Sequence, residues 1–456
     1  MIKTELPAFE SDLMEIVNLF DGVDASTLRH LFSEKENKIV NTIVIGGKSY
    51  AYGNLLPSYS DEIEKKRIYK RYAKLSMYKA LVAYTGKQMP WGALTGIRPT
   101  KLAYQCLENG EDFKEFFINT MKVSPQKTML IEEVLKEQEG IYKKDDKATD
   151  FFVFIPFCPT RCKYCSFITA DVRHAKKYID EYVDALVKEI NQSKPLIKGL
   201  KSIYVGGGTP ISLGAKNLEK VLTALDDICQ GGEYTVEAGR PDILTEEIKD
   251  ILIKHGVNRV CVNPQTFNDK TLKAIGRNHT AQDVVDKYNL VKNSFTTNMD
   301  LIAGLEGETF EDFKYSLDMA ISLSPDNITV HTLCIKKGSY LALNEQKLKE
   351  GEVAKMIDYA KKTLSENGYK AYYLYRQKYM AGNLENTGYT KPFKACKYNI
   401  DVMEEITNNI ACGAGSISKK IFPLENRIER LASPKDVLTY LEKIDKIIED
   451  KKQFFN

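Results

Sequence analysis

The stretch from residue 151 to residue 333 alternates short apolar runs with amphipathic helical patterns, and this alternation restricts the fold more than any other feature. The strand-like runs occupy 151–155, 202–206, 233–238, 258–263, 296–304 and 327–333. Strands that alternate with helices of this length pair in parallel through right-handed crossovers. The turns carry no glycine fingerprint of a dinucleotide-binding domain. The pattern therefore predicts an α/β fold built on a partial (β/α)6 barrel, with its chemistry at the carboxyl ends of the strands.

The flanking segments predict further parts of the chain. Residues 1–141 combine helical patterns with a short hairpin that turns at Gly46-Gly47, so we expect an N-terminal α+β domain. Residues 142–150 are charged and lack apolar periodicity, which is typical of a linker. The barrel is then expected over 151–340. Residues 341–456 carry mainly helical patterns, and we expect a mostly helical C-terminal region that closes the barrel mouth.

The composition of this 456-residue chain excludes several classes of protein. The 65 basic and 62 acidic residues nearly cancel, so a generic nucleic-acid-binding protein is not expected. No apolar run reaches the roughly 18 residues of a membrane-spanning helix, and none is predicted. The start lacks the basic region and apolar core of a signal peptide, so a cytoplasmic location is expected. The nine cysteines, an odd number, argue against a disulfide framework.

Three of these cysteines cluster directly after the first predicted strand, in the sequence FIPFCPTRCKYCSF. Cys158, Cys162 and Cys165 have the spacing C-x-x-x-C-x-x-C. A structural zinc site needs four ligands, and this chain has no second C-x-x-C or H-x-x-x-H pair. An iron–sulfur cluster that only carries electrons also takes four thiolates. Three thiolates leave one iron without a protein ligand, which is the mark of a site that binds and activates a substrate.

The cysteine spacing, its place after the first strand and the expected barrel resemble the radical S-adenosylmethionine (SAM) superfamily. The resemblance implies a [4Fe–4S] cluster held by the three thiols, with the open iron chelating the amino and carboxylate groups of SAM. It also implies that Tyr164 lies against the adenine ring. The sequence YVGGGTP, which ends the second strand, resembles the segment that hydrogen-bonds the amino group of SAM. That role is implied for Gly206, Gly207, Gly208 and Thr209.

Longer segments, at 235–279 and 296–309, resemble the oxygen-independent coproporphyrinogen III oxidase family. The resemblance covers essentially the whole chain for the HemZ-type branch, described as coproporphyrinogen dehydrogenase, through the segments 90–102, 372–400 and 413–419. Carboxylates at strand ends can accept hydrogen bonds from an amino group or a ribose, and an arginine can bind a carboxylate with two parallel hydrogen bonds. The residues that the resemblance implies for SAM binding are Glu237, Gln265, Arg277 and Asp300.

The same resemblance implies the reaction. A SAM-derived 5′-deoxyadenosyl radical takes a hydrogen atom from the β-carbon of a propionate of coproporphyrinogen III, and loss of CO2 and one electron leaves a vinyl group. Two rounds, with two SAM molecules, give protoporphyrinogen IX in haem biosynthesis. An electron donor such as flavodoxin or ferredoxin is the expected partner, and no catalytic residue is expected beyond those of the cluster and SAM.

A site for four propionates around an apolar macrocycle should combine aromatic walls with basic groups. The segment YYLYRQKYM and the residues that follow it supply both kinds of side chain. They predict Arg376, Lys378 and Lys391 as substrate contacts.

One departure from the family keeps other fates of the tetrapyrrole open. The well-known oxidase has a fourth cysteine where this chain has Phe167, and the haem-chaperone branch also has an aromatic residue there. A second hypothesis is therefore a haem-binding chaperone that retains the cluster and SAM, with His331 as a candidate axial ligand. A third hypothesis is a radical SAM methyltransferase that opens the haem ring. All three share every core motif.

Overall fold

The computed structural model describes residues 2–59, 61–96, 98–165, 170–229, 231–334, 350–377 and 380–456. The chain forms two compact units, which consist of residues 1–132 with 382–384 and of residues 133–381 with 385–456. Phe167 and Lys378 lie outside the described residues. The thiol motif and all the predicted barrel strands belong to the second unit.

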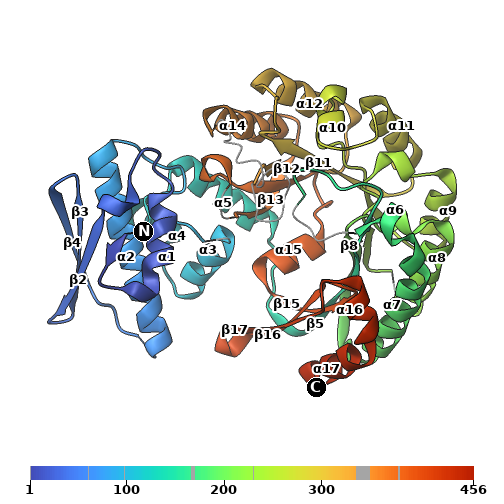
Figure 1. Ribbon diagram of the computed structural model, residues 1–456, viewed down its shortest axis with the longest axis horizontal. Coiled ribbons are helices and arrows are strands. Elements are labelled where there is room, and N and C mark those ends of the chain that lie inside the picture. The colour runs from blue at the N-terminus through green and yellow to red at the C-terminus, as the bar shows by residue number, and fades with distance from the viewer. Residues whose placement is uncertain are drawn as a thin grey trace. The chain divides into compact units, whose positions relative to one another are not determined.

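The first unit is α+β, as the sequence predicts (Figure 1). Its sheet has the order β1-β2-β3-β4, with β1 parallel to β2 and the other pairs antiparallel. The predicted hairpin is confirmed, because Gly46 and Gly47 join β3 to β4 with φ of 56° and 76°, which favour glycine. The strands are β1 (Lys3–Thr4), β2 (Arg29–Lys35), β3 (Lys38–Ile45) and β4 (Lys48–Leu55). The helices are α1 (Glu10–Val17), α2 (Glu62–Thr85), α3 (Pro99–Glu108), α4 (Phe113–Glu115) and α5 (Pro125–Glu137), the last of which ends in the second unit.

An eleven-stranded sheet, counted over the described residues, forms the centre of the second unit. It contains all six predicted strands, β5 (Asp145–Ile155), β8 (Gly199–Gly207), β9 (Glu233–Val236), β10 (Arg259–Cys261), β11 (Thr296–Ala303) and β12 (Asn327–Thr332). These strands lie side by side in chain order, and each pairs in parallel with the next. The predicted α/β architecture is confirmed, and the carboxyl ends of the six strands meet at one edge of the sheet.

The predicted helices connect these strands and lie in an arc along the outer face of the sheet (Figure 1). In α7, Tyr182, Leu186 and Ile190 recur every four residues and are fully buried, so one helical face packs against the strands. Thr245 caps α9 through its hydroxyl, as its position predicts. Over the described residues, no helix combines the length and the apolar character that crossing a bilayer requires. The bounds are α6 (Val172–Ala175), α7 (Ile179–Ser193), α8 (Ala215–Thr223), α9 (Glu246–Lys254), α10 (Asp269–Ala274), α11 (Ala281–Val291), α12 (Phe310–Leu323) and α14 (Glu350–Glu366).

The C-terminal region contains the expected helices and also five strands that the sequence patterns missed. β15 pairs in parallel with β5 and is the last parallel strand of the sheet. At one edge, β14 and then β13 extend the sheet beyond β12 through antiparallel pairs. At the other edge, β16 and then β17 extend it beyond β15, also through antiparallel pairs. A separate two-stranded pair joins β6 (Phe157–Cys158) to β7 (Ala170–Asp171). The C-terminal strands are β13 (Lys370–Tyr375), β14 (Asn386–Thr390), β15 (Thr407–Cys412), β16 (Ile417–Phe422) and β17 (Arg427–Ala432). The helices are α15 (Lys397–Glu404), α16 (Val437–Glu442) and α17 (Ile444–Phe455).

The segment predicted as a linker, 142–150, is instead largely the first half of a central strand. β5 begins at Asp145 and its polar residues pair with β15. Asp150 is buried there and accepts hydrogen bonds from the hydroxyls of Ser202 and Thr407. Thr149 and Asp150 are buried in the sheet while Asp146 and Lys147 are exposed, so this segment is a partly buried strand and not a flexible connection.

Asp150 is expected to make the stability of the second unit depend on pH. Burial, together with the charge of Asp401, raises the pKa of Asp150 to about 8. The unfolded chain loses this proton near pH ~4, so the folded state binds more protons up to pH ~8 and is destabilised as the pH rises. Between pH ~6 and pH ~8, the unfolding free energy of the wild type should fall as the pH rises. In Asp150→Asn, whose side chain is always neutral, this fall should be smaller than in the wild type by about 1 kcal/mol per pH unit. Urea titrations across this range measure the slope.

The matched control is Asp318→Asn, because Asp318 is a half-exposed carboxylate on α12. This control should retain the wild-type slope. A wild-type slope in Asp150→Asn would contradict the assignment.

Candidate functional site

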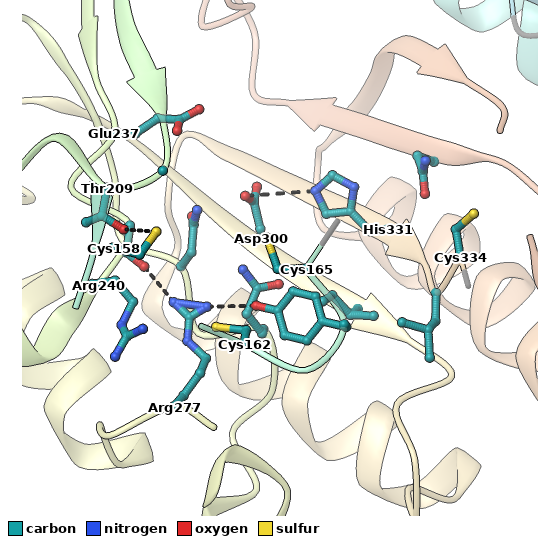
Figure 2. Close-up of a pocket in the computed structure, with 18 of the residues that line it drawn as sticks. Cys158, Cys162, Cys165, Thr209, Glu237, Arg240, Arg277, Asp300, His331 and Cys334 are labelled. Carbon is teal, nitrogen blue, oxygen red and sulfur yellow. Dashed lines mark hydrogen bonds and ion pairs between the residues drawn. The ribbon is translucent and has the colours of Figure 1, made fainter. Parts of the chain in front are cut away.

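A cavity of about 340 Å3 opens at the edge of the sheet where the parallel strands end (Figure 2). Its lining comes from the segments that follow β5, β8, β9 and β10, from the ends of β11 and β12, and from β13 and β14. The predicted residues that line it are Cys158, Cys162, Tyr164, Cys165, Gly207, Gly208, Thr209, Glu237, Gln265, Arg277 and Asp300. Gly206 is the one member of the predicted cluster and SAM set that does not. The structure thus brings together residues spread over about 140 positions of sequence.

The three thiols are on the segment that follows β5. The sulfur of Cys158 lies 3.5 Å from the hydroxyl of Thr209, and the amide of Cys165 donates a hydrogen bond to the carbonyl of Cys162. All three cysteines are partly exposed. Within the described ranges, no group of three or more Cys, His, Asp or Glu side chains is arranged to hold a metal ion. The thiols therefore share one cavity without forming a closed metal site.

Glycines allow the thiol-bearing segment to lie directly on the end of β8. A Cβ atom at Gly208 would be 2.5 Å from the carbonyl oxygen of Phe157, and Gly207 has a φ of 105°. The amides of Gly208 and Thr209 donate hydrogen bonds to the carbonyls of Ile155 and Phe157, both at 2.7 Å. Only glycine permits this backbone approach.

Glu237 directly follows β9 and lies beside the glycine run. A Cβ atom at Gly206 would be 2.9 Å from the carboxyl carbon of Glu237, so this glycine makes room for the carboxyl group. Tyr204 donates a hydrogen bond to Glu237 Oε1 at 2.6 Å. Burial raises the pKa of Glu237 to about 7. The hydrogen bond from Tyr204 acts to lower this pKa, and the negative charge of Asp300 acts to raise it further. This carboxyl group therefore changes its charge near neutral pH.

Gln265 combines an unusual backbone with an unsatisfied side chain. Its φ of 67° lies in the left-handed region, which costs energy for a residue other than glycine. The backbone is held there because the amide of Gln265 donates to the carbonyl of Asp300 and the amide of Ile302 donates to the carbonyl of Gln265. The buried Oε1 has no hydrogen-bond partner among the described residues. A buried amide oxygen without a partner at a cavity wall indicates a ligand-binding position.

Arg277, which is buried, and Tyr164, which is partly buried, form a pair at the cavity wall. Arg277 Nη1 donates to the Tyr164 hydroxyl at 3.1 Å, and Nη2 donates to the carbonyl of Gly239 at 2.7 Å (Figure 2). The Tyr164 ring packs against the apolar cluster that includes Leu272 and Ile302. Arg277 is thus fixed in orientation, and its Nε has no partner among the described residues.

Asp300 is already engaged by protein groups. Asn298 Nδ2 donates to Asp300 Oδ1 at 2.8 Å, and His331 Nε2 lies 3.8 Å from Asp300 Oδ2. Burial alone would raise the pKa of Asp300, but the hydrogen bonds and charge of His331, with Asn298 and Thr329, lower it below the ordinary value. Asp300 therefore stays ionised at the cavity.

The sequence reading missed several cavity residues and considered His331 only as a haem ligand. Three of the missed residues, Arg240, Asn263 and Cys334, lie at or just after the carboxyl end of a predicted strand, and that position was the available signal. Gln377 and Asn386 line the cavity from the C-terminal region, where no strand was predicted. Arg240 is buried and is held by Asp242 and the hydroxyl of Thr160.

Comparisons with known proteins agree with this site. Residues 152–320 match the family described as the radical SAM superfamily. HemZ of Bacillus subtilis (strain 168), an oxygen-independent coproporphyrinogen-III oxidase-like protein, is 36% identical over 416 residues, which cover 86% of this chain and 83% of HemZ. The haem chaperone HemW of Lactococcus lactis subsp. lactis (strain IL1403) is 34% identical over 237 residues, 50% of this chain and 61% of HemW. The structure of coproporphyrinogen III oxidase (HemN) from Escherichia coli is similar with a TM-score of 0.54 and 21% identity, over 68% of this chain and 71% of HemN, which supports the fold.

The chain belongs to the HemZ-type branch of the radical SAM superfamily. Its cofactors are therefore a [4Fe–4S] cluster and SAM. The cavity of this HemZ-type protein fits them, because three thiols suited to iron face the same space as an unsatisfied amide oxygen and two acidic side chains. We expect Cys158, Cys162 and Cys165 to hold the cluster. The other predicted lining residues are expected to contact SAM.

Two of the substrate contacts predicted for this HemZ-type protein, Arg376 and Lys391, do not line the cavity. Arg376 is 2% exposed and does not line it, and burial lowers the pKa of its guanidinium to about 9. Lys391 Nζ donates to the carbonyl and hydroxyl of Ser324, which precedes β12 and thus lies at the other end of this strand. Lys378 lies outside the described residues. Tyr375 and Gln377, which flank Arg376 in the sequence, line the cavity in its place, because successive side chains of an extended chain point to opposite sides.

Glu237 should make SAM binding to the HemZ-type protein depend on pH. Its ionised carboxylate can accept a hydrogen bond from the amino group of SAM, and its pKa is about 7. We expect SAM to bind roughly tenfold more weakly at pH ~6 than at pH ~8, and Glu237→Gln to remove this dependence. Equilibrium dialysis with the reconstituted protein measures both affinities.

Glu311→Gln, at the exposed start of α12, is the control and should keep the wild-type profile. If Glu237→Gln also keeps this profile, Glu237 is excluded as the titrating group.

Proposed function

We propose that this protein catalyses the oxygen-independent oxidative decarboxylation of coproporphyrinogen III to protoporphyrinogen IX. The observation that carries the proposal is the thiol-lined cavity in a chain that is 36% identical to a coproporphyrinogen-III oxidase-like protein over 83% of that protein. The cavity joins the thiols to a second wall of polar and aromatic side chains from β12, β13 and β14. Cofactor and tetrapyrrole side chain can therefore meet in one cavity, which supplies selectivity through positioning.

The cluster and SAM, when bound, supply a 5′-deoxyadenosyl radical. Each round of the proposed reaction removes one hydrogen atom and one CO2 from a propionate and passes one electron to a one-electron acceptor, leaving a vinyl group. Two rounds consume two SAM molecules. We further propose that a flavodoxin or ferredoxin reduces the cluster and that the protein works in the cytoplasm on this small-molecule substrate.

Anaerobic turnover tests the proposal. The cluster is reconstituted, and coproporphyrinogen III, SAM and a chemical reductant are supplied. Divinyl product with two 5′-deoxyadenosine molecules per tetrapyrrole is the expected result. Cleavage of SAM without any vinyl product would overturn the proposal.

A haem-chaperone function is the second candidate, because His331 and Cys334, both possible haem ligands, line the same cavity (Figure 2). A relative named haem chaperone HemW is 28% identical over 305 residues, or 64% of this chain. Stoichiometric haem binding without porphyrinogen turnover would favour this function. A linear tetrapyrrole formed from haem would instead indicate the ring-opening methyltransferase.

A further inference from the structure

Arg240 lines the cavity, and the residues predicted to hold the cluster and SAM do not include it (Figure 2). It is 4% exposed, so its charge is held inside the protein at the cavity wall. Burying a charged group costs free energy unless other groups bind it. The partners of Arg240 therefore indicate what this side chain does.

Asp242 binds one edge of the Arg240 guanidinium. Arg240 Nε donates to Asp242 Oδ1 and Nη2 donates to Oδ2, both at 2.9 Å. Burial alone would raise the pKa of Asp242, but the hydrogen bonds and the charge of Arg240 hold it below its ordinary value, so the pair is ionised. Arg240 lines the cavity and Asp242 does not. The positive end of this ion pair therefore faces the cavity, and the negative end does not reach it.

Arg240 also contacts the segment that carries the thiols. Its Nη1 donates to the hydroxyl of Thr160 at 3.0 Å, and Thr160 lies midway between Cys158 and Cys162. The same hydroxyl donates its own proton to the carbonyl of Gly276 at 3.0 Å. Thr160 thus ties the thiol segment both to the loop after β9 and to the turn between α10 and α11.

The turn between α10 and α11 holds the thiol segment at a second point. The amide of Lys163 donates to the carbonyl of Ile275 at 3.0 Å. Gly276 has a φ of 82°, and a Cβ atom there would be 3.3 Å from the carbonyl oxygen of Arg161. The segment therefore packs closely on this turn on both sides of Cys162.

The charge of Arg240 bears on the ease with which a bound cluster is reduced. Reduction adds one negative charge near the thiols. A cation in the protein interior stabilises that charge more than an exposed cation would, because little water and salt screen it. Net charge and hydrogen bonding around a cluster are among the factors that set its reduction potential.

We propose that Arg240 is a positioning residue for the iron–sulfur cluster, which holds the thiol segment through Thr160 and raises the reduction potential of the cluster by its positive charge. Asp242 fixes the guanidinium in the orientation that this role requires. Entry of the electron precedes any chemistry on a tetrapyrrole, so the role applies whichever tetrapyrrole reaction follows.

Two measurements on the reconstituted full-length protein, without SAM or tetrapyrrole, test the two parts of the role. An anaerobic redox titration followed by electron paramagnetic resonance gives the reduction potential of the cluster. The rate at which iron is released to a chelator reports how firmly the thiol segment is held.

The charge is tested by two substitutions with opposite expected effects. Arg240→Gln removes the cation and should lower the reduction potential, whereas Asp242→Asn removes the compensating anion and should raise it. Arg173→Gln is the matched control, because Arg173 is 67% exposed and forms the same two-bond pair with Asp171 without lining the cavity. It should keep the wild-type potential. An unchanged potential in Arg240→Gln would overturn the proposal, and if that variant assembles no cluster, an unchanged or lower potential in Asp242→Asn would overturn it.

The contact with the thiol segment is tested at Thr160. Thr160→Val keeps the charge of Arg240 but removes both hydrogen bonds of the hydroxyl. We expect iron release to become roughly ten- to a hundredfold faster, the range for loss of a hydrogen bond to a charged group. Thr160→Ser keeps the hydroxyl and should release iron at the wild-type rate. Release at the wild-type rate in Thr160→Val would overturn the positioning role, as would release from Thr160→Ser as fast as from Thr160→Val.

The decarboxylation and the role of Arg240 can fail separately. Absence of vinyl product, with potentials that shift in opposite directions in Arg240→Gln and Asp242→Asn, would reject the reaction and keep the role of Arg240. Vinyl product with an unchanged potential in Arg240→Gln would reject the role and keep the reaction.

Discussion

Cys158→Ala is expected to abolish the iron–sulfur cluster and, with it, all SAM cleavage. Three thiolates are the minimum set for a cluster with one open iron, and the thiol of Cys158 lies next to Thr209 at the end of the glycine run. Loss of one ligand exposes a second iron to solvent. We expect the iron content after anaerobic reconstitution to fall from about four to well below one atom per chain. Iron and sulfide analysis, with 5′-deoxyadenosine as the activity readout, measures the effect.

Cys229→Ala is the matched control for this substitution. Cys229 is also a partly exposed free cysteine, but it does not line the cavity. It should retain the full cluster and normal SAM cleavage. Equal iron loss in both variants would show that the loss is not specific to cysteines of the motif. A full cluster in Cys158→Ala would show that Cys158 is not a ligand of the cluster.

Lys451→Met is expected to destabilise the second unit by about 3–5 kcal/mol, because it leaves a buried carboxylate without its cation. Lys451 on α17 and Glu189 on α7 are 2% and 0% exposed and form an ion pair at 2.5 Å. Lys451 also donates to the carbonyl of Ala411 in β15 at 2.7 Å. The second carboxylate oxygen of Glu189 accepts from the Tyr440 hydroxyl and the Gly413 amide. Urea unfolding followed by circular dichroism measures the change.

The same two helices provide the control, because Lys188 on α7 and Asp445 on α17 form an exposed pair at 2.5 Å. Lys188→Ala should cost less than about 1 kcal/mol. Adding Glu189→Gln to Lys451→Met should recover much of the loss, since the remaining group is neutral. A loss in Lys451→Met no larger than that in Lys188→Ala would mean that the buried pair does not hold α17 to the sheet.

The sequence predicted those features that depend on local periodicity. Period-two runs and amphipathic helices predicted six parallel strands in the correct order, and the spacing of Cys158, Cys162 and Cys165 identified the thiol wall of the cavity. Strand ends in a parallel sheet meet at one edge, so Glu237 and Asp300 could be predicted to lie together.

The features that the sequence did not reveal depend on distant partners. Residues 145–150 look like a linker because their hydrogen-bond partners, including Thr407, lie on a strand near the other end of the chain. Arg376 has the charge expected of a substrate contact, but the alternation of an extended strand turns its neighbour Tyr375 to the cavity instead. The composition of the segment around Arg376 correctly indicated that it lies at the cavity. Which of its side chains face the cavity depends on the path of the backbone.

The parallel pairing of β15 with β5 has a consequence for biosynthesis. The paired residues are about 260 positions apart, so β5 keeps one open edge while most of the chain is being translated. The strand that leads into the thiol segment is completed only when residues 407–412 leave the ribosome. Insertion of the iron–sulfur cluster should therefore follow release of the finished polypeptide, and a ribosome-bound nascent chain that stops before β15 should acquire no iron.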